Sequence, residues 1–188
     1  MKKILLLCIL IPLLGLSQNN YRLGNYTAFK KNNIVFQVKQ PLPSFKQSKE
    51  SHSLDGNDNL VASFEASIHT DPIVLQVYAS PIPERFSNIN WNELFYSEQG
   101  AKEFLDGFLG ASANTAMKIS KHKLLTLNGK DFLVTTSTMT YLGVTQKQIN
   151  WITIYKNNFI NIIASTLLDS FDKNLLFIEN FGSTILID

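Results

Sequence analysis

The chain has 188 residues and a formal charge of +2, from 17 Lys and Arg against 15 Asp and Glu. Both excess positive charges belong to Lys2 and Lys3, so the rest of the chain is balanced and lacks the clustered basic excess that nucleic-acid binding requires. A single cysteine, Cys8, excludes a disulfide within the chain.

Residues 1–17 have the pattern of a bacterial export signal. Two lysines precede an apolar run over residues 4–14, and small residues follow at the positions that signal peptidase inspects. We expect cleavage between Ser17 and Gln18 and a mature protein that is periplasmic or secreted. Cleavage would also remove Cys8, which leaves the mature protein with no thiol nucleophile and no thiolate metal ligand.

Two alternative interpretations of this N-terminus are weaker. A membrane anchor needs about 20 apolar residues, whereas this run is shorter and polar residues 18–21 follow it at once. A lipoprotein signal resembles this one, but it places its cysteine after the apolar run and behind a small residue. Here Cys8 lies inside the run, directly after Leu7. We therefore expect no membrane span after cleavage.

Residues 18–32 are polar and rich in asparagine, and we expect them to form a loose lead-in to a single domain at 33–188. The first expected strand covers 34–38, where apolar side chains occupy alternate positions. Prolines at 41 and 43 end it, because proline cannot donate a hydrogen bond to a ladder. A polar stretch with a turn signal at 55–59 follows.

Two further strands are expected next. Residues 60–68 alternate apolar and polar side chains, which is typical of a strand with one buried face. Residues 73–79 are apolar on both faces except at Gln76, and the turn between the two strands falls at 70–72. Two more prolines end the second strand.

The apolar period then changes to that of a helix over residues 90–109. Asn90 is suited to cap its first turn, and Gly110 to end it. Gly100 weakens the interior and predicts a kink. The apolar residues that share one helical face are Trp91, Leu94, Phe95, Ala101, Phe104, Leu105, Phe108 and Leu109.

Residues 117–167 predict a meander of four strands. Asn128-Gly129 favours a two-residue type I′ turn, which pairs Leu125 with Phe132 and Leu124 with Leu133. Further turns are expected at 142–146 and at Asn157-Asn158, and the lysines at 118–123 are explained by a solvated strand face. The last turn would pair Tyr155 with Ile160, Trp151 with Ala164 and Ile152 with Ile163. Large apolar residues on both faces indicate that both faces are covered.

A second helix is expected over 170–182, with Asp172 favourably placed in its first turn and Gly182 at its end. Residues 185–187 would close the chain as a packed tail. The order of strands, helix, meander and helix predicts an α+β fold, with a central antiparallel sheet and helices packed on its faces.

This order and spacing resembles the PsbP-like fold, which is shared by the PsbP subunit of photosystem II and the Mog family of Ran-binding proteins. The matching parts are the strand 34–38 with Pro41, the helix after 73–77, the hairpin at 125–130, and the strand 162–165 before the last helix. The resemblance covers most of 33–187 and implies an α/β/α sandwich. It carries over no catalytic residue, because members of this fold differ in function.

No catalytic, metal or cofactor motif stands out in the sequence. His52, His69 and His122 share no metal-ligand spacing. The chain has neither a Gly-x-Ser-x-Gly elbow nor a glycine-rich phosphate loop. Asp169 and Asp172 are explained by their place at the start of a helix. We therefore expect no catalytic residue, no metal and no cofactor.

Six aromatic residues crowd the first helix and its approach: Phe86, Trp91, Phe95, Tyr96, Phe104 and Phe108. One face of a helix cannot bury all of them, so most should be core while Phe86 and Tyr96 remain exposed. Exposed aromatic residues are enriched at binding surfaces. Phe86 and Tyr96 are therefore the predicted partner-binding residues.

Two functions remain open on the sequence alone. The favoured one is an exported, non-enzymatic binding or accessory module that supports a protein partner or complex in the bacterial envelope. Well-known members of the resembling family are accessory or binding proteins, which is what the resemblance implies here. The alternative is a cofactor-independent enzyme acting on an extracellular substrate, with His69 and Asp71 as its acid–base pair.

Overall fold

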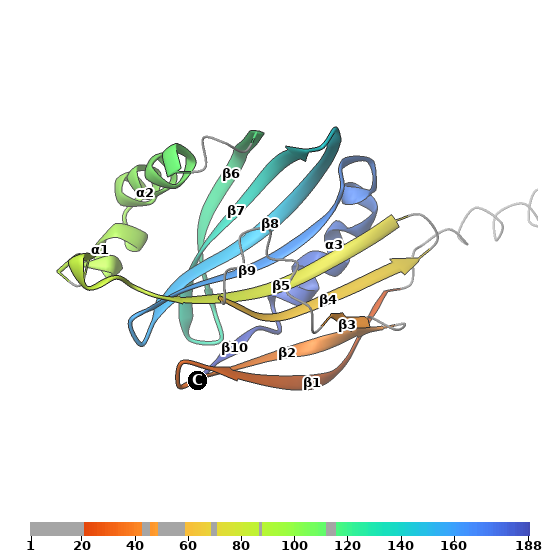
Figure 1. The fold of residues 1–188 in the computed structure, drawn as a ribbon, viewed down its shortest axis with the longest axis horizontal. Coiled ribbons are helices and arrows are strands. Elements are labelled where there is room, and N and C mark those ends of the chain that lie inside the picture. Colours follow the sequence, from red (N-terminus) through yellow and green to blue (C-terminus); the bar gives the residue numbers. More distant parts are fainter. Residues whose placement is uncertain (1–20, 43–45, 49–58, 69–70, 87, 112–115) are drawn as a thin grey trace, which may run out of the picture.

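A computed structural model of the chain describes residues 21–42, 46–48, 59–68, 71–86, 88–111 and 116–188. The expected export signal at 1–17, its cleavage site, His52 and His69 lie outside these residues. Within them, two β-sheets and three α-helices are arranged in layers (Figure 1).

The central sheet has seven antiparallel strands in the order β3-β4-β5-β9-β8-β7-β6. The four-strand meander predicted over 117–167 is confirmed as β6 to β9, and the strands predicted at 60–68 and 73–79 are confirmed as β4 and β5. The strands are β3 (Lys46–Ser48), β4 (Leu60–Ile68), β5 (Asp71–Pro81), β6 (Ala116–Leu127), β7 (Lys130–Tyr141), β8 (Val144–Tyr155) and β9 (Asn158–Leu167).

A smaller sheet contains β1 (Arg22–Lys31), β2 (Ile34–Leu42) and β10 (Leu186–Ile187), in the order β1-β2-β10. The loose lead-in predicted for 18–32 is therefore wrong for Arg22–Lys31. Asn32 and Asn33 both adopt a positive φ and close a tight hairpin between β1 and β2. The strand β1 lies at the sheet edge with several exposed side chains, so it has little apolar alternation to reveal it.

The helix predicted over 90–109 is two helices, α1 (Trp91–Tyr96) and α2 (Glu98–Ala111). The chain breaks at Ser97, which has an extended φ of -103° and ψ of 142°, and not at the kink predicted for Gly100. Ser97 Oγ accepts a hydrogen bond from the Gly100 N–H at 2.9 Å and so caps the start of α2. Gly100 is required for a different reason, because an added Cβ would lie 2.4 Å from the Leu94 carbonyl oxygen.

The second predicted helix is confirmed as α3 (Phe171–Gly182), which follows the short 3-10 turn η2 (Leu168–Ser170). After α3 the chain enters β10, which pairs with β2, so the predicted packed tail at 185–187 is partly a strand. The Ile187 side chain is buried there.

Side chains alternate between two cores on opposite faces of the central sheet, and both faces are covered as predicted. Leu133 and Ile152 pack with α1 and α2. Their neighbours Phe132 and Trp151 belong to the larger core, which also includes residues of α3 and of the smaller sheet. Figure 1 shows α1 and α2 on one side of the sheet and α3 on the other.

The hairpin turn predicted at Asn128-Gly129 is confirmed. Asn128 has φ of 50° and Gly129 has φ of 75°, as a type I′ turn requires. Leu125 pairs with Phe132 and Leu124 with Leu133, as predicted. The Asn128 side chain also donates a hydrogen bond to the Ile185 carbonyl at 2.8 Å, which ties this turn to the chain after α3.

The other two turns of the meander differ from the prediction: the second is shorter, and the third begins one residue earlier. The second comprises only Leu142 and Gly143, so residues 144–146 belong to β8. The third comprises Lys156 and Asn157, with positive φ at both, because the buried Asn158 instead pairs with Tyr155. The predicted pairs are corrected to Tyr155 with Asn158, Trp151 with Ile162 and Ile152 with Asn161. Each partner moves by two residues, so every side chain keeps its predicted face.

Candidate functional site

The predicted surface residue Phe86 lies in a short segment between β5 and α1. We call residues 81–86 and 88–89 the Phe86 segment; it includes the 3-10 turn η1 (Glu84–Phe86). Phe86 is 37% exposed and Ile89 39% exposed, and Pro81 and Pro83 are also exposed. An apolar surface therefore faces outward at this point of the chain.

Hydrogen bonds hold the Phe86 segment in place. Ile82 is buried, and its N–H donates to the Asn157 carbonyl at 3.0 Å. The Phe86 N–H donates to the Pro83 carbonyl at 2.8 Å, and the Ile89 N–H to the Phe86 carbonyl at 3.2 Å. The Arg85 guanidinium lies 4.7 Å from the centre of the Phe86 ring. The segment thus presents an exposed aromatic side chain beside a cation.

The other predicted partner-binding residue, Tyr96, lies at the end of α1, and its side chain is outside the described part of the structure. The side chain of Phe108 is likewise outside it. Phe95 is buried, while Trp91 and Phe104 are partly buried against the same core. Ring contacts run from Phe95 to Phe104, with centroids 5.0 Å apart, and on to Phe159 at 6.0 Å. These aromatic residues attach α1 and α2 to the sheet, as predicted for most of the cluster.

The described parts of the chain do not bring together the histidine and aspartate residues that were considered as catalytic or metal-binding candidates. His122 is exposed on β6, and the side chain of Asp71 lies outside the described residues together with His69. Asp169 and Asp172 are exposed at the start of α3. Among the described residues, no group of three or more His, Cys, Asp or Glu could hold a metal ion. Nor does any described helix have the length and apolar character of a membrane span.

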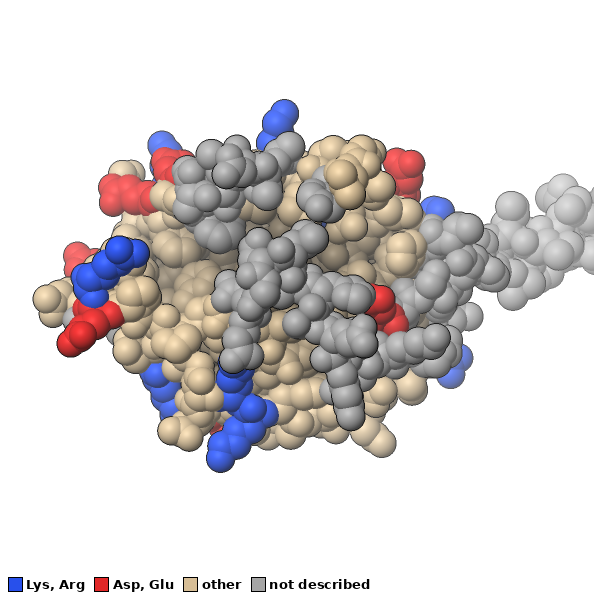
Figure 2. All heavy atoms as spheres, viewed as in Figure 1, with Lys and Arg blue, Asp and Glu red and all other residues tan. Residues whose placement is uncertain are grey.

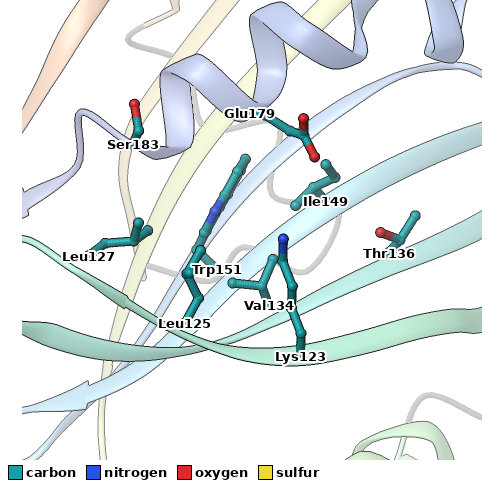
Figure 3. A pocket seen from close by; sticks show the side chains of 9 residues that line it. All are labelled: Lys123, Leu125, Leu127, Val134, Thr136, Ile149, Trp151, Glu179 and Ser183. Carbon is teal, nitrogen blue, oxygen red and sulfur yellow. The ribbon is translucent and has the colours of Figure 1, made fainter.

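A groove that the sequence did not reveal lies between α3 and the strands β6, β7 and β8. We call it the α3 groove. Its apolar end is a hollow of ≈ 280 Å³. Figure 3 shows Trp151 and Lys123 rising from the sheet toward α3, with Glu179 on the helix opposite. The residues lining this end are Lys123, Leu125, Leu127, Val134, Thr136, Ile149, Trp151, Glu179 and Ser183.

The antiparallel register builds the sheet side of the groove. Lys123 pairs with Val134, which pairs in turn with Trp151 on β8. One step along, Lys121 pairs with Thr136, which pairs with Ile149. Because side chains in register share one face, each row points toward α3. The surface thus changes from lysines on β6 to apolar side chains on β8.

The helix side of the groove is formed by three residues spaced four apart, two on α3 and one just after its end. Leu175, Glu179 and Ser183 line the groove together, as this spacing on one helical face allows. Gly182 lies directly against the Trp151 indole, where an added Cβ would come within 2.2 Å of a ring atom. Gly182 therefore packs directly on Trp151, which lines the apolar end of the groove.

An adjoining hollow of ≈ 400 Å³ shares Lys123, Val134, Thr136, Ile149 and Glu179 with the first. Three lysines and two carboxylates line this charged end: Lys121, Lys123, Lys147, Asp172 and Glu179. Lys147 Nζ lies 3.8 Å from Asp172 Oδ1 and 4.2 Å from the centre of the Phe171 ring. Asp172 is 91% exposed, so this ion pair is weak.

The opposite face of the sheet carries buried polar groups that bind one another. The Asn150 side chain donates to Thr135 Oγ1 at 3.2 Å and to Ser137 Oγ at 3.3 Å, and it accepts from Gln148 at 3.4 Å. These side chains are at most 7% exposed. Burial also raises the pKa of Tyr78 on β5 above its ordinary value. The Asn150 network is satisfied internally, which suits a structural role.

Charged residues of one sign do not form a single patch on the face shown in Figure 2. In Figure 2, Lys, Arg, Asp and Glu side chains of both signs lie around the margin of the molecule. This distribution agrees with the balanced charge of the chain after its first residues. The prediction that nucleic acid is not a partner stays a prediction.

Comparison with solved structures shows the fold alone. The chain is similar to the solution structure of cyanobacterial PsbP (CyanoP) from Synechocystis sp. PCC 6803, with a TM-score of 0.57 and 12% sequence identity. That match covers 89% of this chain and 95% of CyanoP. A protein of unknown function from Pseudomonas aeruginosa, PA94, gives a TM-score of 0.50 at 7% identity over 87% of this chain and 97% of that one.

The chain therefore has a PsbP-like α+β fold, as the resemblance predicted. No protein-family model matches the chain. No curated protein matches it in sequence either.

Proposed function

We propose that this protein is a non-enzymatic binding or accessory module that is exported from the cytoplasm and supports a protein partner or complex in the bacterial envelope. One observation carries the proposal. Phe86 and Ile89 in the Phe86 segment are more than a third exposed, while the N–H groups of Ile82, Phe86 and Ile89 all make backbone hydrogen bonds. Aromatic residues and arginine are enriched at protein interfaces, and Arg85 lies beside Phe86.

An ordered surface of this kind suits association with a folded partner. Binding through a segment whose backbone is already restrained by hydrogen bonds loses less conformational entropy, so more of the contact energy appears as affinity. The PsbP-like fold adds support, because the resemblance implies an accessory or binding role. It names no partner for this chain.

Export is the first part of the proposal to test. The protein recovered from outside the cytoplasm should have the mass of a chain that begins at Gln18, or that mass less one ammonia if Gln18 has cyclised. The physical reason is the short apolar run with small residues just before Gln18. Intact mass spectrometry measures this directly. A mass that includes residues 1–17, or a lipid on Cys8, would contradict the predicted cleavage.

Partner binding is tested at Phe86. Phe86→Ala should change the free energy of unfolding by less than about 1 kcal/mol, because the side chain is already partly in water. It should weaken partner binding by about 2 kcal/mol, roughly thirtyfold, as truncating an interface anchor does. The measurement is quantitative co-purification from the native envelope, combined with chemical denaturation of the isolated protein.

Tyr26→Ala is the matched control. Tyr26 is 45% exposed on β1 and has Lys39 Nζ at 5.4 Å from its ring, so it repeats the aromatic and cation pair at another place. It should leave co-purification unchanged. Tyr96→Ala tests the second predicted partner-binding residue by the same two measurements. Recovery of the wild-type protein without any partner, together with turnover of a defined substrate, would favour the enzymatic alternative.

A further inference from the structure

We infer that the α3 groove binds a single-chain amphiphile with an anionic head group. The chain of the ligand would lie over Val134, Ile149 and Trp151, and the head group would lie among Lys121, Lys123 and Lys147. This inference goes beyond the proposed protein partner, because it concerns a different surface from the Phe86 segment.

The shape of the groove suits a molecule with two chemically different ends. Its apolar end is a hollow of ≈ 280 Å³, and the adjoining charged end is a hollow of ≈ 400 Å³. Small-molecule sites in proteins have volumes of about 300–1,000 Å³ and are mostly apolar, with a few polar groups that set orientation. The two hollows adjoin along five shared lining residues, of which Thr136 lies on β7 between Lys121 and Ile149 in the strand register.

The apolar end offers a surface that an alkyl chain can cover. Leu125 and Leu127 from β6 lie beside Val134 from β7 and Trp151 from β8. These residues form a continuous apolar floor, because strand pairing places them on the same face. Val134 and Trp151 are already buried, so the favourable burial comes from the alkyl chain itself and from the parts of Leu125 and Leu127 that are still exposed.

The charged end favours an anion. Lys121, Lys123 and Lys147 face two carboxylates, and Asp172 already lies against Lys147. Among the described residues that line the groove, Glu179 is the carboxylate left to face Lys121 and Lys123. The stems of these lysines can cover the alkyl chain while their ammonium groups remain at the head group. A phosphate or carboxylate head would accept charge-assisted hydrogen bonds from them.

The position of the groove argues against a peptide strand as its occupant. The β6 strand is the edge of the central sheet, where an extra strand could add. That edge carries Lys121 and Lys123 and a register irregularity between Ile119 and Lys121, and both features discourage strand addition. The open edge still gives a flexible amphiphile a way into the groove.

The test uses dodecyl phosphate below its micelle concentration as the probe. The readout is the indole N–H resonance of Trp151, assigned by comparison with Trp91→Phe. Dodecyl phosphate should shift this resonance with saturable binding, because Trp151 lines the apolar end. Dodecyltrimethylammonium, which has the same chain and the opposite charge, should bind at least about tenfold more weakly. Inorganic phosphate alone should leave the Trp151 resonance unchanged.

Two variants locate the binding site. The double variant Lys121→Gln/Lys123→Gln should weaken dodecyl phosphate binding by about tenfold or more. Both lysines are exposed, so the fold should be retained. Lys102→Gln, an exposed lysine on α2 at the other face of the sheet, is the control and should bind as wild type. Thr136→Phe should block binding where the two hollows meet.

The inference is overturned if the cationic amphiphile binds as tightly as dodecyl phosphate, or if the double lysine variant binds as well as wild type. It is also overturned if dodecyl phosphate leaves the Trp151 resonance unmoved. The proposed protein partner is judged separately, by co-purification of Phe86→Ala, so either conclusion can fail alone.

Discussion

Replacing Phe181 with alanine should lower the free energy of unfolding by about 3–5 kcal/mol. Phe181 lies near the end of α3, has no exposed surface, and packs edge-on against Trp151 with ring centroids 6.4 Å apart. Removing the ring leaves a cavity between α3 and the sheet, and it also removes the transfer energy of a large apolar group. Guanidinium denaturation of the purified protein measures the loss.

Leu176→Ala is the control for Phe181→Ala on the same helix. Leu176 is 71% exposed, so shortening it should change the free energy of unfolding by no more than about 0.5 kcal/mol. Equal losses for the two variants would mean that α3 is not attached to the sheet by the packing described here. A loss below about 1 kcal/mol for Phe181→Ala would lead to the same conclusion.

The second large effect is expected at Gly182. Gly182→Ala should lower the free energy of unfolding by about 1–3 kcal/mol, which is the usual cost of overpacking a core. An added Cβ would lie 2.2–2.6 Å from three atoms of the Trp151 indole. Trp151 is 3% exposed and packs directly on Gly182, so either α3 or the indole must shift to make room for the Cβ. Denaturation measures the cost, and the Trp151 indole resonance reports the displacement.

Gly107→Ala provides the matched control, because Gly107 also lies in a helix but has open space where the Cβ would go. Alanine there should raise the free energy of unfolding by about 0.4–1 kcal/mol, since it favours the helix and restricts the unfolded chain. The two glycine variants should therefore differ in sign. If Gly182→Ala were also stabilising, the contact between Gly182 and Trp151 would be wrong.

Local sequence patterns predicted most of the secondary structure of the described domain. Alternation of apolar residues revealed β4, and the Asn128-Gly129 pair specified a hairpin whose register is confirmed. A helical period with Asp172 in its first turn located α3. These predictions succeeded because turn conformation and side-chain periodicity depend on neighbouring residues.

The errors in the predicted turns and helix ends occurred where the sequence fits two local structures equally well. Asn157-Asn158 has the residue types of a turn, yet Asn158 is buried in β9 and receives a hydrogen bond from Asn32 at 3.0 Å. That contact joins residues far apart in sequence, so no local pattern could place the turn at Lys156-Asn157. The break at Ser97 was missed for a related reason. The apolar face continues across it, and a serine inside a helical pattern does not by itself show that it caps a new helix.

The two candidate sites also differ in whether a local sequence pattern predicted them. Phe86 was predicted to be exposed because one helical face cannot bury every nearby aromatic residue, and its exposed position agrees with that expectation. The α3 groove had no such signal. Its lysines on β6 are exposed, as predicted for a solvated strand face, and no local pattern indicated that α3 lies across from them.

The sequence by itself determined the order of the strands and helices, their principal turns and the balanced charge of the chain after its first residues. Tertiary structure decided which elements meet, and Gly182 shows the difference. Its place at the end of a helical pattern was explained locally by the ease with which glycine ends helices. In the folded chain Gly182 needs no positive φ; it is required because Trp151, 31 positions earlier on β8, occupies the space of its Cβ. Local propensity depends on a few neighbouring residues, whereas a groove or a close contact depends on how distant surfaces pack.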